Sequence, residues 1–240
     1  MQPAAALAVP DVWRVQDLAL QAGARPSGHE ALDRHLPGGG WPLGSLIELI
    51  QARPQAPVWQ LVLPALAQLT REQPGPIALV GAPHPPFGPA LAAQGLPADR
   101  LLWIRTDAAA ARLWAAEQAL RCADVAGLLA WLPQVRSQDL RRLHLAAGRH
   151  RKLLFVLRSL DAQQQASPAP LRLRLEGVDE LQVRIVKRKG PPLEEPILLP
   201  AMPARLQALL ASRQQRAAPA PTSQPDPRRS HVLDRLVTAA

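Results

Sequence analysis

Short, continuously apolar runs alternate along this chain with longer segments whose apolar residues recur every three or four positions. Runs of the first kind are typical of buried β-strands, and segments of the second kind are typical of amphipathic helices. The predicted strands are 46–50, 77–81, 101–105, 127–132 and 153–157, and the predicted helices are 58–70, 87–94, 108–122 and 138–148. Apolar strands separated by helices indicate an α/β fold, in which a mostly parallel sheet has helices on both faces.

The pattern changes near residue 171, where apolar and polar residues begin to alternate. Residues 171–176 alternate strictly and residues 181–189 nearly do, with a short turn between them. A period of two predicts a C-terminal antiparallel hairpin that extends the sheet, with one face on the core and one arginine-rich face in solvent. The basic residues of the hairpin are Arg172, Arg174, Arg184, Lys187, Arg188 and Lys189. They form either a solvated face or a basic patch that binds DNA phosphates or an acidic protein.

Proline-rich, polar sequence dominates after residue 190 and is interrupted by two short apolar patterns. Residues 201–216 and 230–237 each predict a short helix without a partner in the chain, and isolated helices of this length are marginal in water. We therefore expect a flexible tail that binds a partner protein. Its candidate partner-binding residues are Leu206, Leu209, Leu210, Val232, Leu233 and Leu236. The predicted organisation is an N-terminal segment over 1–26, a core domain over 27–192 and this tail over 193–240.

A glycine-rich segment, residues 36–44, leads into the first predicted strand. In a P-loop ATPase a second glycine-rich loop follows that strand, because free backbone N–H groups, a lysine and a hydroxyl hold the phosphates and magnesium. Here Gln51, Pro54, Pro57 and Val58 occupy the region, and the two prolines remove backbone donors. The sequence therefore predicts a degenerate P-loop and no nucleotide cofactor.

Two further positions lack the acidic residue that such an ATPase needs. Trp131-Leu132-Pro133 stands at the end of the fourth predicted strand, where a Walker-B acid would lie. Residues 81–85 follow the second strand, where a water-activating glutamate would lie, and they contain no carboxylate. Together with the altered loop, these substitutions predict a scaffold without catalytic residues, not an enzyme.

Several segments resemble a known family when they are taken in combination. Ser27-Gly28 and the glycine-rich segment 36–44 look like the entry to the ATPase core of RecA recombinases. Together with residues 114–120, 139–143, 171–175 and 186–190, they are similar to the ImuA family of RecA-like accessory proteins from bacterial mutasome operons. The resemblance covers roughly residues 10–192.

This resemblance implies a RecA-like fold and a non-catalytic adaptor role in SOS-induced translesion DNA synthesis, the process that causes damage-induced mutagenesis. It implies binding to an ImuB-like homologue of Y-family polymerases and to RecA. Through them the protein would act indirectly with an error-prone C-family DNA polymerase. The unpaired apolar residues of the tail agree with a partner-binding role independently of the family, because such helices need a surface on which to pack.

Three other functions stay open at this point. A SulA-like cell-division inhibitor, acting on the tubulin-like division protein, would use the same fold. A weak ATPase would need a non-standard phosphate loop, against which the two prolines count. A plain DNA-binding protein would use the basic hairpin, and the net charge of +9 suggests an anionic partner. An arginine-rich composition is also typical of GC-rich genomes, so the charge alone does not decide.

Single residues add limits to these functions. Cys122 is the only cysteine, so the chain cannot have an internal disulfide framework, which fits a reducing cytoplasm. We interpret Cys122 as a small, buried hydrophobic residue. No apolar run reaches the roughly 18 residues of a membrane helix, so we expect no membrane partner. The six histidines lack ligand-like spacing, so we expect no metal. The tryptophans Trp41, Trp59 and Trp131 form either part of the core or a recognition patch, and the core is the commoner place.

Overall fold

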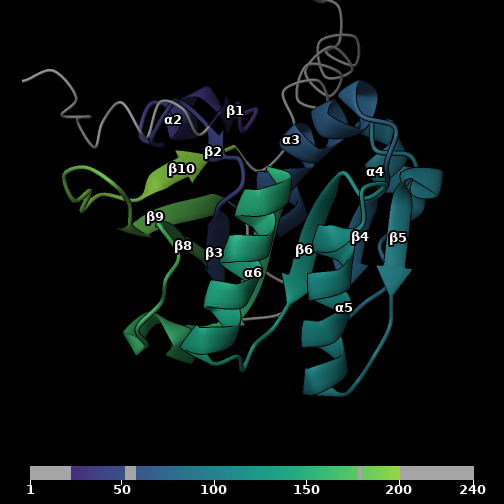
Figure 1. Ribbon diagram of the computed structural model, residues 1–240. Coiled ribbons are helices and arrows are strands. Elements are labelled where there is room, and N and C mark those ends of the chain that lie inside the picture. Colours follow the sequence, from purple (N-terminus) through teal and green to yellow (C-terminus); the bar gives the residue numbers. More distant parts are fainter. Residues whose placement is uncertain (1–22, 52–57, 178–179, 201–240) are drawn as a thin grey trace, which may run out of the picture. The chain divides into compact units, whose positions relative to one another are not determined.

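The computed structural model describes residues 23–51, 58–177 and 180–200, which build an α/β fold on an eight-stranded sheet (Figure 1). The spatial order of the strands is β10-β9-β8-β3-β7-β6-β4-β5. The strands are β3 (Leu46–Gln51), β4 (Ile77–Val80), β5 (Leu101–Ile104), β6 (Gly127–Trp131), β7 (Leu153–Ser159), β8 (Leu171–Glu176), β9 (Leu181–Lys187) and β10 (Ile197–Leu199). Strands β8, β3, β7, β6, β4 and β5 are parallel, and β9 and β10 pair antiparallel, so the predicted mostly parallel sheet is confirmed.

Two apolar cores lie on opposite faces of this sheet. Alternate residues of the strands, such as Leu79 and Phe155, pack with the helices of one face, and their neighbours Val80 and Val156 pack with those of the other. The helices of the first face are α3 (Val58–Glu72) and α4 (Gly88–Ala93), and those of the second are α5 (Ala109–Arg121) and α6 (Ser137–His150) (Figure 1). Since both faces are covered, the central strands are mostly apolar, which is why the sequence shows them as apolar runs.

The C-terminal hairpin extends the sheet beyond β3, as predicted. Strand β8 pairs parallel with β3, and β9 turns back antiparallel to β8. Strand β10 then pairs with β9 and lies after residue 192, the predicted end of the core domain. This architecture is consistent with a RecA-like fold. The chain divides by its internal contacts into Met1–Ala201 and Met202–Ala240, and the second unit lies outside the described residues.

A second, two-stranded sheet holds the glycine-rich segment. Strand β1 (Ala24–Arg25) pairs antiparallel with β2 (Trp41–Pro42). Between them, Gly38 and Gly39 have positive φ values of 78° and 74°, which residues with a side chain rarely adopt. A Cβ atom on Gly40 would lie 2.2 Å from the Arg25 carbonyl oxygen. The three glycines therefore make a tight turn, and their role in the described structure is conformational.

Helix α3 contains a proline in its interior, and a histidine compensates for it. Pro64 has no N–H group to donate to the carbonyl of Gln60, four residues earlier. His29, next to the short helix α2 (Glu30–Asp33), instead donates from Nε2 to that carbonyl over 3.0 Å. A carbonyl oxygen only accepts, so Nε2 carries the proton. Burial lowers the pKa of His29, against the raising effect of the hydrogen bonds to backbone carbonyls at Gln60 and Leu61.

The structure decides several of the single-residue expectations. Trp41 is fully buried and meets Phe155 edge-to-face, with ring centroids 5.2 Å apart, and Trp131 is also buried, so both are core residues. Trp59 is partly buried against the same core. The expectation for Cys122 is wrong, because this residue follows the end of α5 and is exposed. The sequence pattern predicted a helix up to residue 122, but α5 ends at Arg121 and Cys122 lies directly after it.

Candidate functional site

A cavity of about 460 Å³ lies at the carboxyl ends of the parallel strands. Five strands place residues around it at or directly after their ends: Gln51 from β3, Gly81 after β4, Arg105 after β5, Trp131 from β6 and Ser159 from β7. Because parallel strands all point the same way, their ends bring residues from distant parts of the chain to one edge of the sheet. This edge is the usual place for ligand sites in open α/β sheets.

The chain topology opens a crevice at the same edge. The connection after β4 passes through α4 on one face of the sheet to β5. The connection after β6 passes through α6 on the other face to β7, in the opposite direction along the sheet (Figure 1). Strands β4 and β6 are neighbours, so their two connections leave a topological switch point between them. In open α/β sheets, ligands bind in the crevice that forms at such a point.

The rim of the cavity carries positive charge. Arg105 lies with its guanidinium carbon 5.1 Å from the centroid of the Trp103 ring, in a cation–π contact. Arg112, from the first turn of α5, donates from Nε to the carbonyl of Thr106 over 2.8 Å. Both arginines line the cavity, together with Asp107. Within residues 23–51, 58–177 and 180–200, neither arginine has a carboxylate within ion-pair distance.

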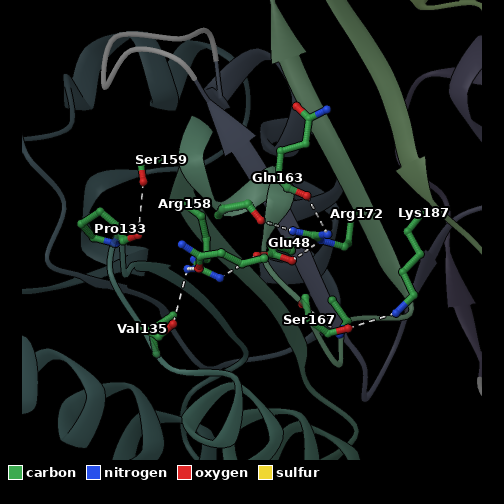
Figure 2. A network of polar contacts seen from close by, with 12 residues as sticks. Glu48, Pro133, Val135, Arg158, Ser159, Gln163, Ser167, Arg172 and Lys187 are labelled. Carbon is green, nitrogen blue, oxygen red and sulfur yellow. Dashed lines mark hydrogen bonds and ion pairs between the residues drawn. The ribbon is translucent and has the colours of Figure 1, made fainter.

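Next to the cavity, a buried ion network joins three neighbouring strands (Figure 2). Glu48 of β3 is fully buried and accepts from Arg158 Nη1 of β7 over 3.0 Å and from Arg172 Nε of β8 over 2.6 Å. Each carboxylate oxygen thus has its own guanidinium partner. Removal of the Glu48 charge would leave two buried guanidinium groups without a counter-charge.

The two arginines of this network are also held by neutral groups. Arg158 donates from Nη2 to Gln165 Oε1 over 2.7 Å and to the Val135 carbonyl over 3.4 Å. Arg172 donates from Nη2 to the carbonyl of Ala162 over 2.6 Å, in the short helix η2 (Leu160–Gln164). The network therefore fixes the segment after β7 and the loop before α6 against the sheet. Arg158 also lines the cavity, so the network supports one of its walls.

Glu48 and Arg158 were not among the predicted site residues. One signal was available, because Glu48 interrupts an otherwise apolar strand in the middle of the sheet. A carboxylate at such a place is expected to have a buried cationic partner. The sequence does not indicate which arginine provides it, since Arg158 and Arg172 are 110 and 124 residues away along the chain.

The residues of the predicted degenerate P-loop are described only in part. Gln51 ends β3, is 7% exposed and lines the cavity, and Val58 is the first residue of α3 and is buried. Pro54 and Pro57 lie outside the described residues. At the end of β6, where a P-loop ATPase would have its Walker-B acid, Trp131 and the following Pro133 lie on the cavity wall. The degenerate loop stays a prediction.

The predicted basic patch is divided by the structure into buried and exposed residues. Arg172 is 6% exposed and belongs to the ion network, so the expected solvent face of the hairpin is wrong at this position. The reason is that α6 and η2 cover the same face of the sheet as Glu48. Arg174 is half-buried, pairs with Glu176 and donates to Gln163 Oε1 over 3.1 Å.

The other basic residues of the hairpin lie nearer solvent and bind backbone carbonyls. Arg184 donates to the Glu194 carbonyl over 2.6 Å and Lys187 to the Ser167 carbonyl over 3.0 Å. Arg188 donates to the carbonyls of His35 and Pro191. Lys189 is exposed. A role for these residues in binding DNA or an acidic protein stays a prediction.

The remaining candidate residues lie outside the described part of the chain. They are Leu206, Leu209, Leu210, Val232, Leu233 and Leu236. Within the described residues, no group of three or more His, Cys, Asp or Glu side chains is arranged to hold a metal ion. Over the same residues, the helices are too short or too polar to cross a bilayer.

Comparison with known proteins gives two relatives, and no family model matches the chain. The chain is 29% identical over 116 residues to the cell division inhibitor SulA of Edwardsiella piscicida, a match of 48% of this chain and 69% of that protein. It is similar to SulA proteins. A second cell division inhibitor SulA, from Photorhabdus laumondii subsp. laumondii, is 30% identical over 79 residues. That match covers 33% of this chain and 45% of the relative, so less than half of the second SulA protein is spanned.

Proposed function

We propose that this protein is a non-catalytic accessory protein of the SOS response that acts by binding other proteins. Its first role would be that of an adaptor in translesion DNA synthesis, as the resemblance to the ImuA family implies. Its partners would be an ImuB-like homologue of Y-family polymerases and RecA, and indirectly an error-prone C-family polymerase. All of these partners act in the cytoplasm, where we expect the protein.

One observation carries this proposal. The carboxyl edge of the sheet is where a RecA-like ATPase holds its nucleotide, and here Gln51, Trp131 and Pro133 stand on the cavity wall at the strand ends. These side chains provide neither the carboxylate nor the hydroxyl with which such ATPases hold magnesium. A retained fold with different groups at this edge favours a scaffold whose surfaces bind proteins.

The sheet itself offers one way to bind a partner. Strand β5 is the last strand of the sheet, pairs only with β4 among the described strands, and carries Leu102, which is 43% exposed. An extended segment of another protein could pair with such an edge, with backbone hydrogen bonds providing affinity. The predicted helices of the tail offer a second way, in which an amphipathic helix packs into a groove of the partner.

A second function is favoured by the comparisons. Both relatives carry the name cell division inhibitor SulA. The chain would then inhibit cell division after DNA damage by binding the tubulin-like division protein. This function also requires a protein-binding scaffold of the SOS response, so the two candidates differ in the partner and share the mode of action.

A capture experiment distinguishes the two. The full-length protein and a variant that ends at residue 212 are immobilised and offered purified ImuB-like protein, RecA and the tubulin-like division protein, each with and without ATP. ATP-independent capture of the first two supports the adaptor. Capture of the division protein, with inhibition of its polymerisation in a sedimentation assay, supports the division inhibitor.

The tail variant makes the experiment sharper. We expect removal of residues 213–240 to weaken capture without changing the melting temperature of the core domain, because the sequence predicts tail helices that lack a partner in the chain. A full-length variant with Leu233→Asp and Leu236→Asp tests the same point without truncation, and the double variant Ser230→Asp with Thr238→Asp, which adds the same two negative charges at polar positions, serves as its control. Loss of capture together with an equal loss of thermal stability would contradict a direct role of the tail.

A further inference from the structure

Three polar atoms around the carboxyl-edge cavity lack a hydrogen-bond partner among the described residues. They are Oε1 of Gln51, Nε1 of Trp103 and Nε of Arg158, and all three are buried. Each of the three residues lines the cavity. Gln51 and Arg158 are only 7% and 2% exposed, so bulk water does not compensate these atoms. Buried polar atoms in folded proteins nearly always have a partner, and an unpartnered group indicates an absent ligand or a bound water.

The chemistry of the three atoms describes what would satisfy them. The Trp103 and Arg158 atoms are N–H donors, and the Gln51 atom is a carbonyl acceptor. A group that accepts from the two donors and lies beside one that donates to Gln51 would complete the set. Carboxylates and phosphates accept several hydrogen bonds at once, and an adjacent ammonium, amide or hydroxyl supplies the donor.

The charge at the cavity mouth points to the same ligand. Arg105 and Arg112 line the cavity without a carboxylate partner in the part of the chain that is described, whereas Asp107 is the one carboxylate on that lining. Arg158 adds a guanidinium whose charge is already balanced by Glu48. A net positive lining raises the local concentration of anions.

The size and walls of the cavity limit the ligand to a small molecule. Its volume of about 460 Å³ is within the range of sites for small organic ligands. Trp131, Leu157 and Pro133 supply apolar wall area between the polar groups. The cavity also lies at the topological switch point between β4 and β6, where open α/β sheets bind their ligands.

We propose that this cavity binds a small organic anion that carries a carboxylate or a phosphate next to an N–H or O–H donor. The anionic group contacts the indole N–H of Trp103 and Nε of Arg158, with the guanidinium of Arg105 beside it, and the adjacent donor contacts the side-chain carbonyl of Gln51. This ligand site goes beyond the proposed protein-binding function and does not depend on which partner protein is bound.

Isothermal titration calorimetry of the full-length protein tests the site with two probes, O-phospho-L-serine and L-glutamate, in the presence of EDTA. L-Serinamide is the comparison, since it keeps the ammonium and hydroxyl donors but carries no anionic group. We expect at least one anionic probe to bind with Kd below about 1 mM, and L-serinamide to bind at least tenfold more weakly. Stronger binding of phosphoserine identifies a phosphate ligand, and stronger binding of glutamate identifies a carboxylate.

Three variants connect binding to the named atoms. Trp103→Phe keeps an aromatic ring but removes the indole N–H, and Arg105→Gln removes the charge; we expect each to weaken binding by about tenfold. Arg105→Lys, which keeps the charge, should restore much of the affinity. Arg141→Gln, at an exposed arginine of α6 outside the cavity, is the matched control and should bind as the unchanged protein does.

Two results would overturn the proposal. One is the absence of binding by both probes up to about 10 mM, which is too weak for a built site. The other is binding that Trp103→Phe and Arg105→Gln leave unchanged while their melting temperatures show intact folding. Neither result bears on the capture of partner proteins, so this site and the proposed function fail separately.

Discussion

Glu48 of β3 and Arg172 of β8 form a buried ion pair between residues 124 positions apart in the sequence, with 2.6 Å between Oε2 and Nε. Arg158 of β7 occupies the other carboxylate oxygen, so three adjacent strands meet at one buried carboxylate. The two arginines carry one more charge than the glutamate, and backbone carbonyls and Gln165 solvate the excess. The network therefore fixes the hairpin and the segment after β7 to the centre of the sheet.

Glu48→Gln should destabilise the fold strongly. The amide keeps the shape of the side chain but leaves two buried guanidinium groups without a counter-charge, which costs about 3–5 kcal/mol of unfolding free energy. Urea denaturation followed by circular dichroism measures this loss. Glu30→Gln removes an exposed pair with Arg34 and serves as the control, for which we expect almost no change. Equal stability of Glu48→Gln and the unchanged protein would show that the network does not hold the strands.

His29 and Pro64 should be coupled energetically. His29→Ala leaves the Gln60 carbonyl without a donor, because Pro64 has none, and we expect a loss of about 1–3 kcal/mol. In a Pro64→Ala background the new backbone N–H can donate to the same carbonyl, so His29→Ala should cost less there. A double-mutant cycle by chemical denaturation measures the difference. A cost of His29→Ala that is the same in both backgrounds would contradict this explanation of the proline.

His144 should make stability depend on pH. Its Nδ1 accepts the backbone N–H of Leu46 over 3.1 Å, which requires an unprotonated Nδ1. Burial, followed by the charge of Lys189, lowers the pKa of His144 from the ordinary value of 6.5. Between the lowered pKa and 6.5 the unfolded chain binds more protons than the folded one, so the contribution of His144 to stability is lost as pH falls through this window.

The variant His144→Asn isolates this effect from the other titrating groups. Asparagine keeps a side-chain acceptor for Leu46 but does not titrate. We expect the difference in unfolding free energy between the unchanged protein and the variant to shift in favour of the variant as pH falls below 6.5, and to be constant above it. Parallel stability profiles over the whole range would mean that His144 has the same pKa in both states.

The sequence predicted the strands and helices well because their signals are local. Residues 153–157 are apolar throughout and residues 46–50 are apolar except for Glu48, and both lie in central strands with helices on each face. The cavity was not predicted, since its wall combines the ends of five strands whose order in space is not written in any one segment.

The solvent face of the hairpin shows the limit of a pattern. Alternation places Arg172 and Arg174 on the same face of β8 but does not tell what covers that face. A buried carboxylate from a strand more than 100 residues away decides the environment of Arg172. Likewise, Cys122 fits a helix pattern, although the helix ends one residue earlier and the side chain is exposed.

The predicted degenerate P-loop has a direct consequence for nucleotide binding. A working P-loop gains affinity for ATP from magnesium, which its Ser or Thr hydroxyl coordinates, and the bound nucleotide raises the melting temperature by an amount that grows with the logarithm of its concentration over Kd. Trp131 and Pro133, on the wall where the acidic metal partner would lie, offer no such ligand. We expect that adding Mg²⁺ to ATP leaves the melting temperature of this protein unchanged, whereas RecA in the same assay is stabilised.

The comparison of ATP with and without Mg²⁺ distinguishes a P-loop from the anion site proposed at the cavity, since that site needs no metal. Stabilisation that appears only with Mg²⁺ would show a functional nucleotide site and contradict the adaptor without ATP turnover.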